Sequence, residues 1–120
     1  MDTNKMFLEK VVDIFNTGDL SEVDNLFADN YIDHQKPEYI KVDGAEEFKQ
    51  VVTGARKSLN NLHVSIIHQS SDDNMITGRL NWKGLNANGQ NVERETTDTL
   101  RIENNKVVEH WGVEEWSKTS

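Results

Sequence analysis

Hydrophobic residues recur at helical spacing in three stretches of the first half of the chain. The first stretch ends at Gly18, and Asp2 or Thr3 can cap its start. Ser21 and Asp24 resemble a capping box for a second, short helix. The apolar positions of these two predicted helices are Phe7, Val11, Ile14 and Phe15, then Val23, Leu26 and Phe27. Neither helix is long enough to be stable alone, so both must pack on something larger.

A third helix is predicted to begin after Asp43, which caps it together with Glu46. Its apolar positions form a single stripe, made of Phe48, Val51, Val52, Ala55 and Leu59. A stripe of this width is typical of a helix that lies on a surface and is not surrounded by the core.

From Leu62 the period of the pattern changes to two residues, which is typical of β-strands. Four strands are predicted, at 62–68, 75–82, 90–103 and 106–116. Asn88-Gly89 and Asn104-Asn105 are tight-turn signals between consecutive strands, so the strands form an antiparallel meander. The sequence therefore predicts an α+β fold, with three N-terminal helices packed on a curved four-stranded antiparallel sheet that leaves an open pocket at one end.

Composition narrows the class of protein. A chain of 120 residues suits one domain, here 1–120. It has no cysteine, which excludes a disulfide framework and a thiolate metal site. The formal net charge of −8, without basic clusters, argues against a nucleic-acid partner. The N-terminus lacks signal-peptide features and no apolar run could span a membrane, so we expect a cytoplasmic protein with no membrane partner.

The third predicted strand places polar side chains on an inward face. Leu100 and Ile102 fix that face as inward, so Thr96 and Asp98 point inward as well. An inward carboxylate must be paired, hydrogen-bonded or neutralised. The available partners are Arg94 on the same face and a histidine on the next strand. A structural ion pair at the end of the sheet is the alternative interpretation.

The last strand supplies that histidine. Its residues fall into two rows, with Val108, His110, Gly112 and Glu114 on one side and Val107, Trp111 and Val113 on the other. The first row mixes apolar and polar groups, which suits the wall of a cavity. Pairing across the Asn104-Asn105 turn brings Asp98 level with His110 within a residue or two. His110 could equally be a hydrogen-bonded histidine of the core.

The second row is continuous and apolar, and none of the predicted helices can cover it. An apolar patch of this kind usually marks an interface. A two-fold partner would cover it with its own equivalent surface. We therefore expect a homodimer through the outer face of the sheet, with Trp111 near its centre.

A further polar cluster lies between the second and third predicted helices. Tyr31 and Ile32 indicate a short extended segment, and Pro37 forces the residue before it out of the helical region. His34 lies within this segment. It is either a site residue or ordinary polar surface.

Arg101 to Trp111 closely follows the sequence Arg-Ile/Val-x-x-Gly-Lys-Ile-Val-Glu-His-Trp-Asp, and Tyr31-Ile32-Asp33-His34 precedes the third predicted helix. In these motifs the chain resembles the SnoaL-like polyketide cyclase branch of the nuclear-transport-factor-2-like superfamily. The resemblance covers nearly the whole chain. It implies an α+β barrel-like fold with a conical pocket and a dimer formed through the sheet. The family's acid/base Asp follows His-Trp, and the chain departs from this pattern because Gly112 stands there.

Three functional hypotheses follow. The first is a cyclase or isomerase that needs no cofactor and no metal and acts on a small apolar or carbonyl-containing molecule. Proton abstraction next to a carbonyl requires a base, a hydrogen-bond donor and a dry pocket. His110 or Asp98 is the candidate base and His34 the candidate donor. The candidate substrate-binding residues are Tyr31, Trp82, Arg94, Thr96 and Gly112.

The second hypothesis is a binding or accessory module without turnover, which Gly112 favours. The third is a structural dimerising module.

Overall fold

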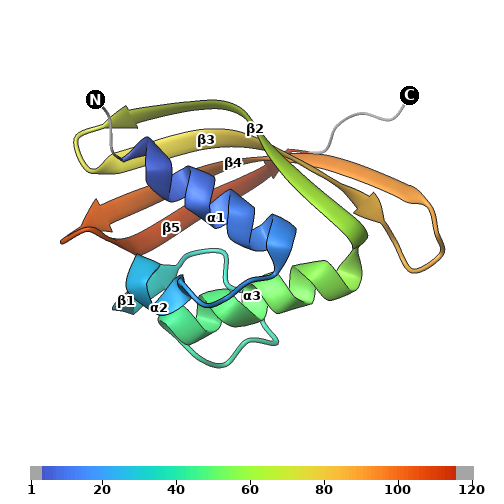
Figure 1. Cartoon of the computed structure of the whole chain (residues 1–120), viewed down its shortest axis with the longest axis horizontal. Helices are drawn as coiled ribbons and strands as arrows, with labels where there is room; N and C mark the ends of the chain where they lie inside the picture. Colours follow the sequence, from blue (N-terminus) through green and yellow to red (C-terminus); the bar gives the residue numbers. More distant parts are fainter. Residues whose placement is uncertain (1–3, 116–120) are drawn as a thin grey trace.

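The computed structural model describes residues 4–115, with three helices and five strands (Figure 1). The helices are α1 (Lys5–Thr17), α2 (Val23–Leu26) and α3 (Ala45–Ser58). The strands are β1 (Phe27–Asp33), β2 (Asn60–Asp72), β3 (Met75–Leu85), β4 (Asn91–Glu103) and β5 (Lys106–Glu115). No helix within these residues is long and apolar enough to cross a membrane.

The sheet is mixed and has five strands in the order β1-β5-β4-β3-β2. The predicted meander is present, but the prediction of a four-stranded, purely antiparallel sheet is wrong. Residues 27–33 form an additional edge strand, which pairs with β5 in parallel. Its burial does not alternate regularly, and its register to β5 shifts between Phe27 and Ile32, so its sequence shows no clear strand period.

The helices cover one face of the sheet and enclose the core. α1 lies across the sheet and contacts β2 and β3, and α3 packs beside it against β1 and β2 (Figure 1). Phe15 and Phe48 make an edge-to-face aromatic contact between these two helices, with ring centroids 5.6 Å apart. Ile76, Gly78 and Leu80 are buried, so this face of β3 lies against the core.

Two of the three predicted helix caps differ from the structure. Gly18 ends α1 in the left-handed conformation, with φ of 76°, as expected. The predicted caps Asp2 and Thr3 lie outside the described residues. Ser21 does not cap α2, because Glu22 is the N-cap residue and makes no side-chain cap bond.

At the start of α3, Gly44 is the N-cap residue instead of Asp43. The Asp43 carboxylate accepts a hydrogen bond from Lys36 at 2.8 Å and is therefore engaged elsewhere. Gly44 has a φ of 74°, and its N–H donates to the carbonyl of Tyr31 at 3.3 Å. This hydrogen bond attaches the beginning of α3 directly to β1.

A β-bulge in the last hairpin corrects the predicted faces of β5. Arg101 pairs with Glu109 and Ile102 pairs with Val107, so Val108 is an extra residue on β5. The side-chain alternation changes there, and Val107 turns into the core with 0% of its surface exposed. The expected outer row of Val107, Trp111 and Val113 is therefore wrong at Val107.

The bulge predicts that alanine substitutions at two valines of β5 destabilise the protein to different extents. Val107→Ala should lower the free energy of unfolding by about 2 kcal/mol, because it removes two buried methyl groups and leaves a cavity. Val113, which is 62% exposed, serves as the matched control. Val113→Ala should change the free energy of unfolding by less than about 0.5 kcal/mol. Denaturant unfolding measures both values. Equal costs for the two substitutions would contradict the inward position of Val107.

Candidate active site

A cavity of about 160 Å³ lies between the helices and the inner face of the sheet. Most of its wall is apolar and comes from α1, α3 and the inward residues of β3 and β4. The polar side chains on the wall are Tyr31, Asp33, Gln35, Trp82, Thr96, Asp98 and His110. An enclosed apolar wall with a few converging polar groups is the usual form of a small-molecule site.

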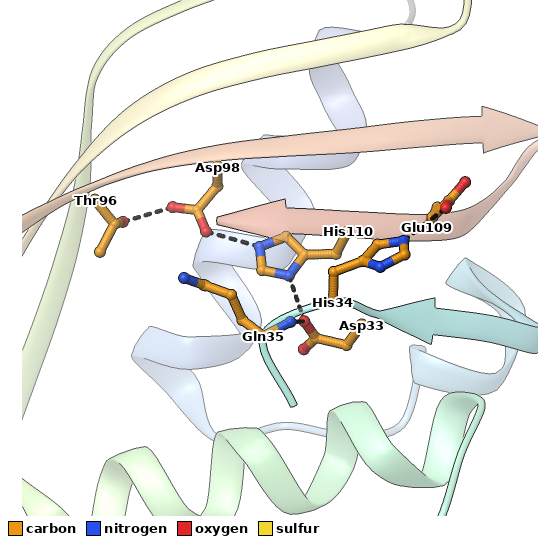
Figure 2. A network of polar contacts seen from close by, with 7 residues as sticks. All are labelled: Asp33, His34, Gln35, Thr96, Asp98, Glu109 and His110. Carbon is orange, nitrogen blue, oxygen red and sulfur yellow. Dashed lines mark hydrogen bonds and ion pairs between the residues drawn. The ribbon is translucent and has the colours of Figure 1, made fainter. Parts of the chain in front are cut away.

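His110 occupies the centre of this polar group and lies between two carboxylates (Figure 2). Its Nε2 atom lies 2.7 Å from Asp98 Oδ1, and its Nδ1 atom lies 2.9 Å from Asp33 Oδ1. Both contacts are largely shielded from solvent, since these three side chains are 7–16% exposed. An imidazole with an acceptor at each nitrogen is best satisfied when both nitrogens carry a proton.

The two carboxylates determine the charge of the ring. Burial on its own would lower the pKa of His110, but the hydrogen bonds and charges of Asp33 and Asp98 more than offset it and raise the pKa to about 9. His110 is therefore an imidazolium at neutral pH. It acts as a fixed positive charge between two carboxylates and cannot accept a proton in this state.

Asp33 was not among the predicted site residues, although it contacts His110 directly. β1 pairs with β5 so that Asp33 stands opposite His110, and both point inward. Burial alone would raise the pKa of Asp33. The hydrogen bond and charge of His110, together with the N–H of Gln35, outweigh burial, so the pKa of Asp33 lies below its ordinary value. The one available signal in the sequence was the two-residue spacing from Tyr31, which is buried on the same side of β1.

Asp98 holds the other end of a continuous hydrogen-bonded chain. Trp82 Nε1 donates to the hydroxyl of Thr96 at 2.8 Å, and this hydroxyl donates to Asp98 Oδ2 at 2.5 Å. Asp98 Oδ1 then faces His110. The predicted proximity of Asp98 and His110 is correct, with Asp98 opposite Gly112 and therefore two residues from His110 in register. Asp98 is thus an inward carboxylate whose two oxygens are both held in place.

His34 does not line this cavity, which contradicts its prediction as the hydrogen-bond donor of the site. It follows Asp33, so the alternation of side chains turns it toward the outer side of the sheet. There its Nε2 atom contacts Glu109 at 2.7 Å, and its ring stacks on Trp111 with centroids 5.0 Å apart. Figure 2 shows the His34 ring turned toward Glu109 and away from Asp98.

The remaining predicted residues divide into two groups. Tyr31, Trp82 and Thr96 line the cavity. Burial and the charges of nearby carboxylates, Asp33 foremost, raise the pKa of Tyr31, so its hydroxyl keeps its proton. Arg94 and Gly112 do not line the cavity, and Arg94 lies 3.4 Å from Glu114 near the end of the sheet.

A buried carboxyl on α3 is a second residue that the sequence did not reveal. Glu47 is only 1% exposed, and within residues 4–115 its Oε2 atom has no hydrogen-bond partner. Burial, together with the charge of Asp33, raises its pKa to about 7. It lies beside the site and not on the cavity wall.

A larger hollow of about 590 Å³ lies between α1, α2 and the turn that follows β4. It contains none of the candidate site residues, and its acidic groups, Asp13, Asp19 and Glu22, are exposed. Of these two hollows, the smaller one is the candidate site, because in it the buried group of His110, Asp33 and Asp98 meets an apolar wall. In the described part of the chain, no group of three or more His, Asp or Glu side chains is placed to hold a metal ion.

The raised pKa of His110 predicts how stability depends on pH. Because the folded pKa of about 9 exceeds the unfolded value of 6.5, the stabilisation is complete below pH 6.5 and is lost as pH rises through 9. The wild-type protein should lose a few kcal/mol of unfolding free energy over this range. His110→Gln should be less stable at pH 6.5 and should lack most of the decline. Glu47, with a folded pKa of about 7, adds only the end of its own decline at the lower edge of this range, and it does so in both proteins. A decline of equal size in His110→Gln would therefore contradict the assignment.

Comparison with known proteins gives the family. The chain matches the model of the SnoaL-like polyketide cyclase family over residues 5–119. No protein with a curated description matches the chain.

Three solved structures illustrate the likeness in fold. A SnoaL-like polyketide cyclase from Agrobacterium tumefaciens is 18% identical, with a TM-score of 0.80, and the match covers 96% of this chain and 93% of that one. TsrD from Streptomyces laurentii is 16% identical, with a TM-score of 0.81 and coverage of 95% and 90%. An NTF2-like protein from Anabaena variabilis is 14% identical, with a TM-score of 0.77 and coverage of 94% and 87%. These likenesses show an α+β NTF2-like fold, and the family match shows that the chain belongs to the SnoaL-like polyketide cyclase family.

Proposed function

We propose that the protein is an acid/base enzyme that abstracts a proton next to the carbonyl group of a small substrate, leading to aldol-type ring closure or isomerisation. The observation that carries this proposal is the buried chain Thr96–Asp98–His110–Asp33 along an apolar cavity. Abstraction of a carbon-bound proton needs a base in a dry site, and Asp98 is the carboxylate held at that wall.

Asp98 is the proposed base, and His110 fixes its position. The His110 imidazolium lies 2.7 Å from Asp98 Oδ1, and the charge of Asp33 in turn stabilises the imidazolium. His110 is the less suitable base because both of its nitrogens are engaged. His34 is unsuitable as the donor because its side chain lies on the outer side of the sheet.

The size of the cavity supports a small substrate. Pockets for drug-sized ligands usually measure about 300–1,000 Å³, whereas this cavity measures about 160 Å³. A polycyclic molecule would require the walls to move apart. A compound with one ring or a short chain and one or two carbonyl groups fits the space and the apolar wall better.

The alternative function is a binding or accessory module with the same cavity and no turnover. The specific observation in its favour is Gly112, which leaves the chain without the carboxylate that the family resemblance places after His-Trp. In that case His110 and its two carboxylates would recognise the ligand and hold the strands together. Turnover distinguishes the two functions.

Exchange of the α-hydrogens of cyclohexanone for deuterium, followed by NMR, tests the proposed reaction. The wild-type protein should accelerate the exchange above the buffer rate, and Asp98→Asn should reduce this acceleration by about 10²- to 10⁴-fold because it removes the base. Glu95→Gln is the matched control, since Glu95 lies on the same strand and pairs with Arg79 on the outer face. An acceleration that survives in Asp98→Asn would refute the role of Asp98, and none in the wild type would favour the binding module.

We also propose a homodimer through the outer face of the sheet. Val107 takes no part in this interface because it is buried in the core. Trp111 is half-buried beneath His34, and Val113 is largely exposed. Neighbouring outer-face residues form polar pairs, including Arg79 with Glu95 at 2.8 Å, so the contact would combine an apolar centre with a charged surround.

Light scattering at micromolar concentration tests the dimer. The native protein should give twice the mass of one 13.8 kDa chain. Trp111→Glu should shift it toward monomer, because a buried aromatic at such a centre contributes on the order of 2 kcal/mol. A native mass of one chain would rule out the dimer, and in that case the stack on His34 is the main cover of Trp111.

A further inference from the structure

Gly112 lies against the side chain of Gln35, which lines the cavity. A Cβ atom built on Gly112 would lie 2.8 Å from Gln35 Cδ and 3.0 Å from Asp98 Oδ1, and it would overlap Gln35 Oε1. Gly112 is not among the residues with positive φ, so its backbone does not require glycine. A side chain at position 112 would instead push aside the flexible end of Gln35 and press on Asp98 Oδ1.

The site holds the backbone of Gln35 in this position. The N–H of Gln35 donates to Asp33 Oδ1 at 2.8 Å, and this oxygen also faces His110. Its backbone is therefore attached to the same carboxylate that stabilises the imidazolium. The side chain then extends along the wall beneath Asp98 (Figure 2).

The Gln35 amide differs from the other polar groups on the wall because it is not engaged. Trp82 donates a hydrogen bond to Thr96, and Thr96 donates one to Asp98. The His110 ring donates one hydrogen bond to Asp33 and one to Asp98. Tyr31 shares a hydrogen bond with Asp33. Among residues 4–115, no hydrogen bond of the Gln35 side chain occurs, although its amide offers two donor hydrogens. Gln35 is exposed to solvent, so its amide is accessible to a ligand that enters the cavity.

Resting on the proposed function, we propose that Gln35 is a catalytic residue that donates a hydrogen bond to the carbonyl oxygen of the substrate, and that Gly112 is the position that makes room for it. As Asp98 takes the proton from the neighbouring carbon, the C–H electron pair forms the carbon–carbon double bond of an enolate. The carbonyl π pair moves onto oxygen, where the Gln35 amide stabilises the developing charge.

The second half of the reaction returns the proton. In isomerisation the substrate carries a carbon–carbon double bond next to the carbon that loses the proton, so the product of abstraction is a dienolate, and Asp98 delivers the proton to its γ carbon. In ring closure the enolate carbon attacks a second carbonyl of the same molecule, and the resulting alkoxide takes the proton from Asp98. Both routes need a carbonyl oxygen and an adjacent C–H within one small molecule, which defines the substrate class.

The cyclohexanone exchange assay tests the role of Gln35. Gln35→Ala should reduce the acceleration by about a hundredfold, as expected for the loss of one donor to an oxyanion. Gln35→Glu should also reduce it, because a carboxylate keeps the shape but offers no donor when ionised. Glu38→Gln, on the exposed part of the same loop, should leave it unchanged.

A double substitution tests the shared space. Gly112→Ala should lower exchange in the wild-type background, because the added methyl group displaces the Gln35 amide, and it should cost little unfolding stability, because the end of this side chain can move aside. In the Gln35→Ala background it should lower exchange by no more than about twofold, because the amide is already gone. If Gly112→Ala fails to fold, the double variant should fold again, and failure of both would contradict the shared space. Equal losses of exchange on Gly112→Ala in both backgrounds would also contradict the shared space.

The outcomes separate this inference from the proposed function. Exchange that depends on Asp98 but not on Gln35 overturns the role of Gln35 alone. Exchange that is absent in the wild type, or that survives in Asp98→Asn, overturns the proposed function and the inference with it.

Discussion

The arrangement of the site depends on one buried interaction, in which the His110 imidazolium lies between the carboxylates of Asp33 and Asp98. These three residues come from β5, β1 and β4, so their side chains connect three adjacent strands. Buried ion pairs seldom add much stability, because taking each charge out of water costs several kcal/mol. What this one provides is a fixed geometry, since each group is satisfied only when the other two are in place.

The register of the sheet follows the same constraint. Parallel pairing of β1 with β5 puts Asp33 opposite His110, which turns Asp33 and Gln35 toward the cavity and His34 away from it. The bulge at Val108 lies between the core position of Val107 and the site position of His110. It allows Val107 to pack inward at the end of the strand while His110 points into the cavity two pairs further along.

The sequence predicted those parts of the site that depend on a regular alternation. β4 has no bulge between Thr96 and Leu100, so the inward position of Asp98 followed directly from its period of two. The sequence did not reveal the bulge in β5, because a run of valines fits either face. β1 carries no clear period, so the choice between Asp33 and His34 depended on a pairing that only the folded chain defines. Glu47 and Gln35 were missed because their surroundings come from residues far away in the chain.

The charge of His110 is the central claim, and a ¹⁵N NMR titration of its ring tests it most directly. The account predicts that both ring nitrogens carry a proton at pH 7 and that the ring titrates at about pH 9. Asp98→Asn and Asp33→Asn should each lower this value, since each removes one of the two charges that hold the proton. A ring that is neutral at pH 7, with one unprotonated nitrogen and a midpoint at or below the ordinary histidine value of about 6.5, would contradict the account.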